Sequence, residues 1–292
     1  MLKFYKGGVF MLKVTFFGTT TMLFDDGVDQ ILFDAHFTRP SLYYFFTGKP
    51  VSTNTDLCDK LIKHHKINRL KAIFVSHAHH DHAMDAPYIA NRCSAKIYGS
   101  NSVRNIAIGG KVKESNIEVF EDGSCYTIGK YKISVIKALH SVPTKVFDNI
   151  GEEITEPLVQ PATFWDYKEG GSYDFFVEHE GQKILLHPSF NYIEGKLDGI
   201  EADVVFLGVA GIANAKKEIV EKFFDENVIK TKANLVIPVH WDNFFSPLDK
   251  PIQEIADYVD AADETFYKTA SYCAEKRINF LLQYPCTSIE LK

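Results

Sequence analysis

The stretch "KAIFVSHAHHDHAMDAP", residues 71–87, places four histidines and two aspartates directly after an apolar run. The apolar run predicts a buried strand that ends at Ser76. The polar residues after it therefore lie in a loop at the carboxyl edge of a sheet, where α/β proteins commonly bind ligands. Imidazole and carboxylate groups that converge on one point suit a dication such as Zn²⁺. The stretch thus predicts a metal site.

The spacing within this stretch divides its polar residues into two groups. His77 and His79 are two residues apart and point the same way from an extended segment. Asp81 and His82 follow where the chain turns into a helix, so they face a neighbouring point. His80 is expected to point away and to pack or lie on the surface. The simpler interpretation, a solvated histidine-rich turn, is disfavoured because random loops rarely present H-x-H-x-D-H after a buried strand.

Composition limits the classes of partner. The chain has 292 residues and a net charge of −6, and its lysines are scattered among acidic residues, so we expect no nucleic-acid partner. Its five cysteines never form a C-x-x-C pair, which indicates reduced thiols and a cytoplasmic protein. Lysines and glycines interrupt the apolar start, so we expect neither a secretory signal nor a membrane span. Residues 1–10 are interpreted as either an extension or a mis-called start.

Short apolar runs alternate with helix-like stretches along the whole chain, which predicts one α/β domain over residues 1–292 with helix, sheet, sheet and helix layers. The strands at 12–18 and 29–37 are expected to pair, and those at 117–139 to be antiparallel. Helices are expected near 250–260 and 263–276, and a final strand at 279–284. The polar stretch 141–173 is long enough to predict a functional loop.

H-A-H-H-D-H at 77–82 resembles the H-x-H-x-D-H signature of the metallo-β-lactamase fold superfamily. His140 and His240 each close an apolar strand where that family has a histidine, and Gly18 in "FFGTT" and Asp34 in "ILFDAHF" are also similar. The resemblance covers roughly residues 12 to 245 and is nearest to the metal-dependent hydrolase and sugar-phosphate lactonase-like branch. It implies a four-layer αβ/βα sandwich.

The resemblance also implies two neighbouring metal sites. It makes His77, His79 and His140 the ligands of a first metal, and Asp81, His82 and His240 those of a second. Family members usually supply a bridging aspartate after the strand that corresponds to "KILL", where this chain has Ser189. A neutral hydroxyl carries no charge to offset a dication.

The presence of Ser189 in place of an aspartate changes the charge balance of the predicted metal sites. Two divalent ions bring four positive charges against one negative charge from Asp81, because ligating histidines are neutral. We therefore expect one firmly bound metal and a second that is weak or absent. His187 is either a replacement ligand or a residue that closes its strand against the loop.

Such a site favours hydrolysis of an ester, lactone or phosphoester-type small molecule by metal-activated water. Asp81 is the expected catalytic residue, which orients the water and accepts its proton. Asp34 either fixes an imidazole tautomer or caps a turn. Zn²⁺ is the favoured metal, with Mn²⁺, Fe²⁺, Co²⁺ and Ni²⁺ as alternatives.

Substrate contacts are expected from the aromatic segment 37–46 and from the long loop, which carries a Gly-Gly hinge. Arg39 is the candidate to pair with a substrate anion. The remaining candidates are Trp165, Tyr167, Ser189 and Trp241; either tryptophan is alternatively a core residue.

An iron-dependent oxidoreductase of this fold would need a carboxylate at His79 and a flavin module, and a nuclease would need an inserted domain and a basic groove. Neither set is present. A catalytically silent metal-binding regulatory protein remains the alternative function. The C-terminal helix and "NFLLQYP" are candidates for homo-oligomer contacts.

Overall fold

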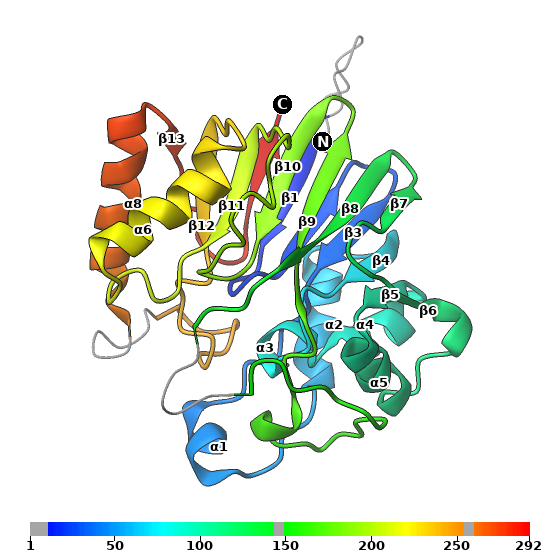
Figure 1. The fold of residues 1–292 in the computed structure, drawn as a ribbon. Coiled ribbons are helices and arrows are strands. Elements are labelled where there is room, and N and C mark those ends of the chain that lie inside the picture. Colours follow the sequence, from blue (N-terminus) through cyan, green and yellow to red (C-terminus); the bar gives the residue numbers. More distant parts are fainter. Residues whose placement is uncertain (1–10, 143–148, 254–259) are drawn as a thin grey trace.

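The computed structural model describes residues 11–142, 149–253 and 260–292, so the expected extension at 1–10 lies outside the described residues. In the described part of the chain, two seven-stranded sheets pack face to face, and helices cover their outer surfaces (Figure 1). This arrangement confirms the predicted α/β four-layer sandwich.

The first sheet has the strand order β14-β1-β2-β3-β4-β5-β6. Strands β3 to β6 are parallel, whereas β14, β1, β2 and β3 pair in antiparallel fashion. The strands are β1 (Leu12–Phe16), β2 (Met22–Asp25), β3 (Gln30–Phe33), β4 (Leu70–Phe74), β5 (Lys96–Gly99), β6 (Ile117–Val119) and β14 (Thr287–Leu291).

The second sheet has the strand order β13-β12-β11-β10-β9-β8-β7. Strands β10 to β13 are parallel, and β7 to β10 form an antiparallel meander. The strands are β7 (Cys125–Ile128), β8 (Tyr131–Ala138), β9 (Ser172–His179), β10 (Gln182–His187), β11 (Val204–Gly208), β12 (Leu235–Val239) and β13 (Asn279–Phe280).

Helices α2, α4 and α5 flank the first sheet, and α6 and α8 flank the second (Figure 1). The α-helices are α1 (Leu42–Thr47), α2 (Thr55–His64), α3 (His80–Ala83), α4 (Ala86–Cys93), α5 (Asn101–Gly109), α6 (Lys217–Phe224) and α8 (Ala262–Lys276). Single turns are η1 (Glu114–Asn116), η2 (Phe164–Asp166) and the π-turn η3 (Asp225–Ile229). No helix among the described residues is both long and apolar enough to span a bilayer.

Strand β3, at the centre of the first sheet, is buried on both faces, which explains its continuous apolar run. Ile31 and Phe33 of β3 belong to the core between the two sheets. Leu32 between them belongs to the core under the helices, with Leu57 of α2 and Ile89 of α4. Burying such a side chain contributes about 1.5–3 kcal/mol, so the two cores hold the sheet in position from both sides.

The metal-ligand candidates follow the carboxyl ends of strands that meet at one edge of the sandwich. Strands β3 and β4 are parallel and end just before Asp34 and His77. In the second sheet, β8 and β12 end just before His140 and His240. The fold therefore brings together histidines that lie far apart in the sequence.

Two pairing predictions are wrong. The strands at 12–16 and 30–33 do not pair directly, because β2 lies between them and pairs with both. β6 is not antiparallel to the strands that follow it, because it pairs with β5 in parallel within the first sheet. In both cases the choice of partner is non-local, whereas apolar periodicity reports only that a strand exists.

The C-terminal region differs from its prediction in one element. Strand β13 ends at Phe280, and the chain then turns and returns along β1 as β14. The side chain of Gln283 holds this turn by donating to the carbonyls of Val14 and Thr287, at 3.2 and 2.9 Å. The helix at 263–276 is confirmed as α8. Most of the helix expected near 250–260 lies outside the described residues.

Candidate metal centre

The six predicted ligands form two clusters at the sheet edge. His77, His79 and His140 form the first cluster, and Asp81, His82 and His240 form the second. Within each cluster, one ligand atom per residue lies within 4.8 Å of the others. That spacing suits side chains that converge on a cation with ligand distances of about 2 Å.

The first cluster combines a loop with a distant strand. His77 and His79 lie in the segment between β4 and α3, and His79 caps α3 with extended backbone at φ −62° and ψ 154°. His140 arrives from the end of β8 in the opposite sheet. The three rings meet edge to face, with centroids 4.7 to 4.8 Å apart. Extended backbone thus presents alternate histidines to one point, as the spacing predicted.

Hydrogen bonds on the outer side of these rings set their tautomers. His79 Nε2 lies 2.7 Å from the amide oxygen of Asn149, and His140 Nδ1 lies 3.0 Å from the carbonyl of Ser141. Both partners are acceptors, so each ring carries its hydrogen on that nitrogen, and its other nitrogen supplies the lone pair for a cation. His77 Nδ1 contacts the Ser76 hydroxyl at 3.2 Å. His77 Nε2 is buried and has no hydrogen-bond partner.

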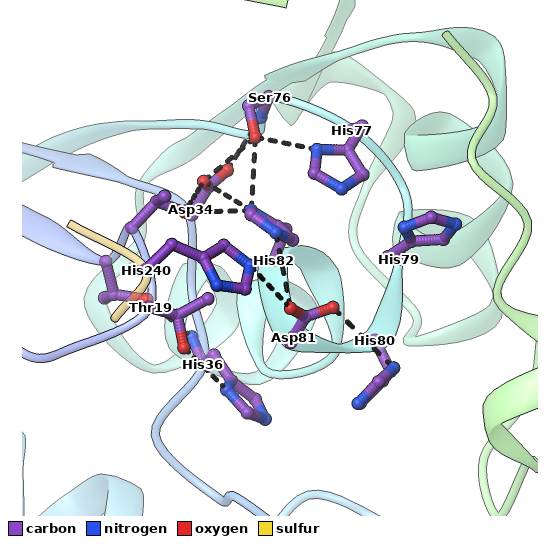
Figure 2. Close-up of polar contacts among 12 residues, drawn as sticks. Thr19, Asp34, His36, Ser76, His77, His79, His80, Asp81, His82 and His240 are labelled. Atoms are coloured by element: carbon purple, nitrogen blue, oxygen red, sulfur yellow. Dashed lines mark hydrogen bonds and ion pairs between the residues drawn. The ribbon is translucent and has the colours of Figure 1, made fainter. Parts of the chain in front are cut away.

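The second cluster is built around Asp81 (Figure 2). Its Oδ2 lies 3.4 Å from His82 Nε2 and 3.3 Å from His240 Nε2. Asp81 and His82 lie in the short helix α3, whereas His240 follows β12. His240 has a φ of +61°, and its backbone N–H donates to the carbonyl of Thr19 at 2.6 Å. This bond holds His240 in a backbone conformation that residues other than glycine rarely adopt.

Asp34 contacts the second cluster through His82, as Figure 2 shows. Its carboxylate accepts from the backbone N–H of Ser76 at 2.7 Å and from the hydroxyls of Ser76 and Thr20. Its Oδ2 also lies 2.8 Å from His82 Nδ1. Through this contact Asp34 orients the imidazole of His82, which is one of the two roles that the sequence left open for Asp34.

The two clusters differ in charge. Burial, together with the neighbouring imidazoles, holds the pKa of His77 well below its usual range, and burial does the same for His79. These rings are therefore neutral at pH 7. Burial would also lower the pKa of His82, but the carboxylates of Asp81 and Asp34 outweigh it and raise that pKa to about 10. Burial opposes ionisation of Asp81, yet the adjacent imidazoles hold its pKa well below the usual range.

The donor set fits a divalent cation. The unpartnered Nε2 of His77 and Nδ1 of His240 are buried polar atoms whose desolvation nothing among the described residues offsets. A bound cation would accept the lone pair of such a nitrogen and so offset the cost of its burial. Neutral imidazoles with one adjacent carboxylate are ligands that Zn²⁺ and similar metals accept.

His80 belongs to neither cluster, although its Nδ1 lies 3.7 Å from Asp81 Oδ1. Its ring stacks on Phe164 with centroids 4.1 Å apart, and it is buried. His179, which belongs to neither cluster, is buried and lies 3.2 Å from the carboxylate of Asp26.

The expectation that Arg39 pairs with a substrate anion does not hold. The side chains of Arg39 and Asp242 are 0% exposed, and Arg39 Nη2 lies 2.7 Å from Asp242 Oδ2. The same nitrogen donates to the carbonyl of Phe17 at 2.9 Å. The charge of Arg39 is already neutralised inside the protein.

Tyr167 and Trp241 are also interior residues, so their expected substrate contacts do not hold. Tyr167 is fully buried, and its hydroxyl accepts from the Gln160 amide at 3.0 Å. Trp241 packs edge-on against Phe266 with centroids 5.2 Å apart. Each ring therefore has the core role that the sequence left open for Trp241.

The three remaining candidate residues differ in burial and in their contacts. Trp165 is partly exposed and packs against Phe45 with centroids 5.1 Å apart. Ser189 is buried just after β10 and belongs to neither ligand cluster. His187 closes β10, and its nitrogens contact the Asp174 carboxylate and the Asn191 carbonyl at 2.9 and 2.8 Å. With both nitrogens engaged, His187 is a structural residue and not a replacement ligand.

Sequence reasoning missed the residues that support the proposed ligands through hydrogen bonds. Asn149 lies in a long polar stretch without periodicity, so no local signal marks it as the partner of His79. Thr20 and Ser76 were detectable as hydroxyl residues at turns beside Gly18 and His77, but their target, Asp34, is distant. Arg39 and Asp242 lie far apart in the sequence, so their pairing carries no local signature.

The comparisons with known proteins agree with this arrangement. Residues 13–240 match the model of the beta-lactamase superfamily domain. A UPF0173 metal-dependent hydrolase of Christiangramia forsetii is 31% identical over 134 residues, which are 44% of this chain. The match covers 49% of that protein, so the chain spans about half the length of this curated relative.

Solved structures share the fold at low sequence identity. Igni18, a metallo hydrolase from Ignicoccus hospitalis, is 15% identical with a TM-score of 0.60, over 97% of this chain and 99% of its own. The metallo-beta-lactamase fold protein YhfI from Bacillus subtilis is 13% identical with a TM-score of 0.54, over 95% and 99% of the two chains. At such identity the likeness establishes the fold alone. The family match over most of the chain does more, and it makes this protein a member of the beta-lactamase superfamily.

Proposed function

We propose that this protein is a metal-dependent hydrolase and that His77, His79 and His140 hold its metal ion. The observation that carries the proposal is the convergence of three imidazoles whose outer nitrogens are hydrogen-bonded within the protein. These contacts fix the orientation of each ring. Zn²⁺ is the metal that three imidazoles fit best, with Mn²⁺, Fe²⁺, Co²⁺ and Ni²⁺ as alternatives.

The second cluster, Asp81 with His82 and His240, is proposed to bind a second ion weakly or not at all. Asp81 supplies the one negative charge in the two clusters, and the neutral hydroxyl of Ser189 adds none. Two dications bring four positive charges to this buried region, and uncompensated buried charge is strongly unfavourable. A single ion leaves much less charge unbalanced.

A bound dication of this kind lowers the pKa of water to about 7 and polarises a carbonyl or phosphoryl oxygen. The chain supplies the remaining functions. Asp81, the ionised member of the second cluster, would orient the attacking water and accept its proton. Asp34 holds His82 in place from behind, and Asn149 does the same for His79.

The substrate is proposed to be a small molecule with an ester, lactone or phosphoester bond. Metal-activated water serves all of these bonds, and the specificity lies in the surrounding loops. The relative from Christiangramia forsetii carries the name of a metal-dependent hydrolase, which supports the reaction class.

A combined metal and activity measurement tests this proposal. Protein purified without added metal is analysed for metal content and assayed on a panel of esters, lactones and phosphodiesters, before and after EDTA treatment. We expect about one tightly bound ion per chain, loss of turnover with EDTA, and recovery with Zn²⁺. His77→Ala removes both the ion and turnover, whereas His64→Ala, on the exposed face of α2, changes neither. Bound metal without turnover on any class would instead favour the regulatory metal-binding alternative.

A further inference from the structure

A cluster of partly exposed aromatic side chains lies beside the metal centre. We define this aromatic surface as Tyr43, Phe45, Phe46, Trp165, Phe244 and Phe245. Three of these residues belong to α1, a six-residue helix that buries none of its side chains. Phe46 is 72% exposed. Displaying several large aromatic rings on one short helix leaves apolar area in water, and such patches typically mark binding sites.

Ring contacts connect this surface to a proposed ligand. Phe45 lies 5.1 Å from Trp165 and 6.2 Å from Phe245, measured between ring centroids. Phe245 lies 4.5 Å from Phe244, and Phe244 meets the His240 ring edge-on at 5.4 Å. The aromatic surface therefore runs without interruption from α1 to the second cluster. Figure 1 shows α1 at the same end of the molecule as α3, which carries Asp81.

Exposed apolar side chains also flank His140 in the sequence. His140 and His240 are the partly exposed members of the two clusters, so solvent reaches the centre on their side. Leu139 precedes His140 and is exposed, and Val142, two residues after it, is 73% exposed. The partly exposed ligand candidates His140 and His240 thus each have apolar side chains close by.

Two described cations near this surface are already engaged within the protein. Arg39, at the start of the aromatic segment, is buried in its ion pair with Asp242. Lys49 borders the surface, but its amine donates to the Tyr43 hydroxyl at 2.6 Å and lies 5.0 Å from the centre of that ring. Neither cation is placed to hold a phosphate or carboxylate at the centre.

We propose that the aromatic surface binds the apolar portion of the substrate, which makes the preferred substrates uncharged carboxylic esters or lactones with an alkyl or aryl acyl group. This inference rests on the proposed hydrolase function. In the reaction the acyl carbon–oxygen bond breaks, and water supplies a hydroxyl group to the acyl carbon and a proton to the leaving oxygen. The aromatic rings hold the acyl chain while its carbonyl lies at the metal centre.

Two measurements test the proposal independently of each other. Binding of the neutral apolar dye N-phenyl-1-naphthylamine to EDTA-treated protein is followed by fluorescence, which requires neither metal nor turnover. Hydrolysis by the zinc-loaded protein is measured on p-nitrophenyl esters from acetate to octanoate. Each assay is run on wild type, on Phe46→Ala, and on the control Tyr267→Ala. Tyr267 is 70% exposed and lies on α8, at the other end of the molecule (Figure 1).

We expect kcat/KM to rise about fourfold for each added methylene, the factor that corresponds to about 0.8 kcal/mol per buried CH₂. Phe46→Ala reduces this increment and weakens dye binding, whereas Tyr267→Ala alters neither. A flat ester series, or dye binding unaffected by Phe46→Ala, overturns the proposal. Dye binding that depends on Phe46 without hydrolysis of any ester contradicts the proposed function and leaves the apolar site in place. A concentration-dependent dimer that Phe46→Ala abolishes also overturns the proposal, because a second copy would then cover the surface.

Discussion

The guanidinium of Arg39 and the carboxylate of Asp242 form an ion pair with an N–O distance of 2.7 Å, and both side chains are fully buried. Asp242 lies two residues after His240, and its Oδ1 accepts from the backbone N–H of Thr19 at 2.8 Å. Thr19 in turn accepts the backbone N–H of His240. The ion pair thereby fixes the loop that carries a proposed ligand to the turn between β1 and β2.

Loss of one partner of this ion pair should be strongly destabilising. Removing one partner of a buried pair leaves an uncompensated charge and costs about 3–5 kcal/mol. We expect Arg39→Met to lower the free energy of unfolding by that amount in urea titrations. The control Arg92→Met breaks the exposed pair with Asp59 and should cost about 0–1 kcal/mol. Equal effects of the two substitutions would contradict the role assigned to Arg39.

The residue at position 18 should be restricted to glycine by the same ion pair. A Cβ on Gly18 would lie 1.9 Å from Arg39 Nη2 and 2.4 Å from Asp242 Oδ2, and Gly18 has a φ of +90°. We expect Gly18→Ala to destabilise the protein in thermal unfolding more than Gly27→Ala does. Gly27 also has a positive φ, but nothing lies within 4 Å of its added Cβ. Similar losses at both positions would show that backbone strain alone accounts for the effect.

Asn149 should tune the affinity of the first metal site through His79. Removing a residue that orients a metal ligand typically weakens binding by about 10–100-fold. We expect Asn149→Ala to weaken Zn²⁺ binding in competition titrations with a chelator. Asn149→Asp should restore it only in part, because a carboxylate accepts the Nε2 hydrogen but cannot donate to the Tyr167 carbonyl as the amide does at 3.0 Å. Asn91→Ala, an exposed substitution on α4, serves as the control. Unchanged affinity in Asn149→Ala would exclude this role.

The contact between His187 and Asp174 predicts a pH-dependent stability. Burial opposes the charged form of His187, but Asp174 outweighs it and raises the pKa of His187 above its usual 6.5. The folded protein therefore binds this proton more tightly than the unfolded chain does. The resulting stability is fully present below pH 6.5 and is lost as the pH rises through the raised pKa.

Urea unfolding of EDTA-treated protein measures this dependence. We expect the stability difference between wild type and Asp174→Asn to be larger at about pH 6 than at about pH 9. A difference that is constant between these two pH values would mean that His187 does not titrate with its partner.

The features that could be predicted from the sequence are those whose pattern lies within one short segment. His77 to His82 were identifiable because the strand end and the ligand spacing lie in one short segment. His140 and His240 were identifiable because each closes an apolar strand whose carboxyl end reaches the same edge. The pairing of β6 and the burial of Arg39 were not, because both depend on partners that the fold supplies from elsewhere in the chain.

Substrate-side residues were the least predictable part of the site. An aromatic or basic residue has the same sequence appearance whether it lines a binding surface or fills the core. Trp165 and Tyr167 are two residues apart, yet one is partly exposed and the other fully buried. Their difference arises from the capped turn η2, in which the Asp166 carboxylate accepts from the backbone N–H and hydroxyl of Thr163.

The central claim, that His77, His79 and His140 hold one metal ion, is tested most directly by a crystal structure of zinc-loaded protein with anomalous data collected on both sides of the zinc absorption edge. The account predicts a strong peak within about 2.0–2.1 Å of one nitrogen from each of the three histidines. A weaker peak or none is predicted beside Asp81, His82 and His240. Absence of a peak at the three histidines, with zinc present in solution, would contradict the account.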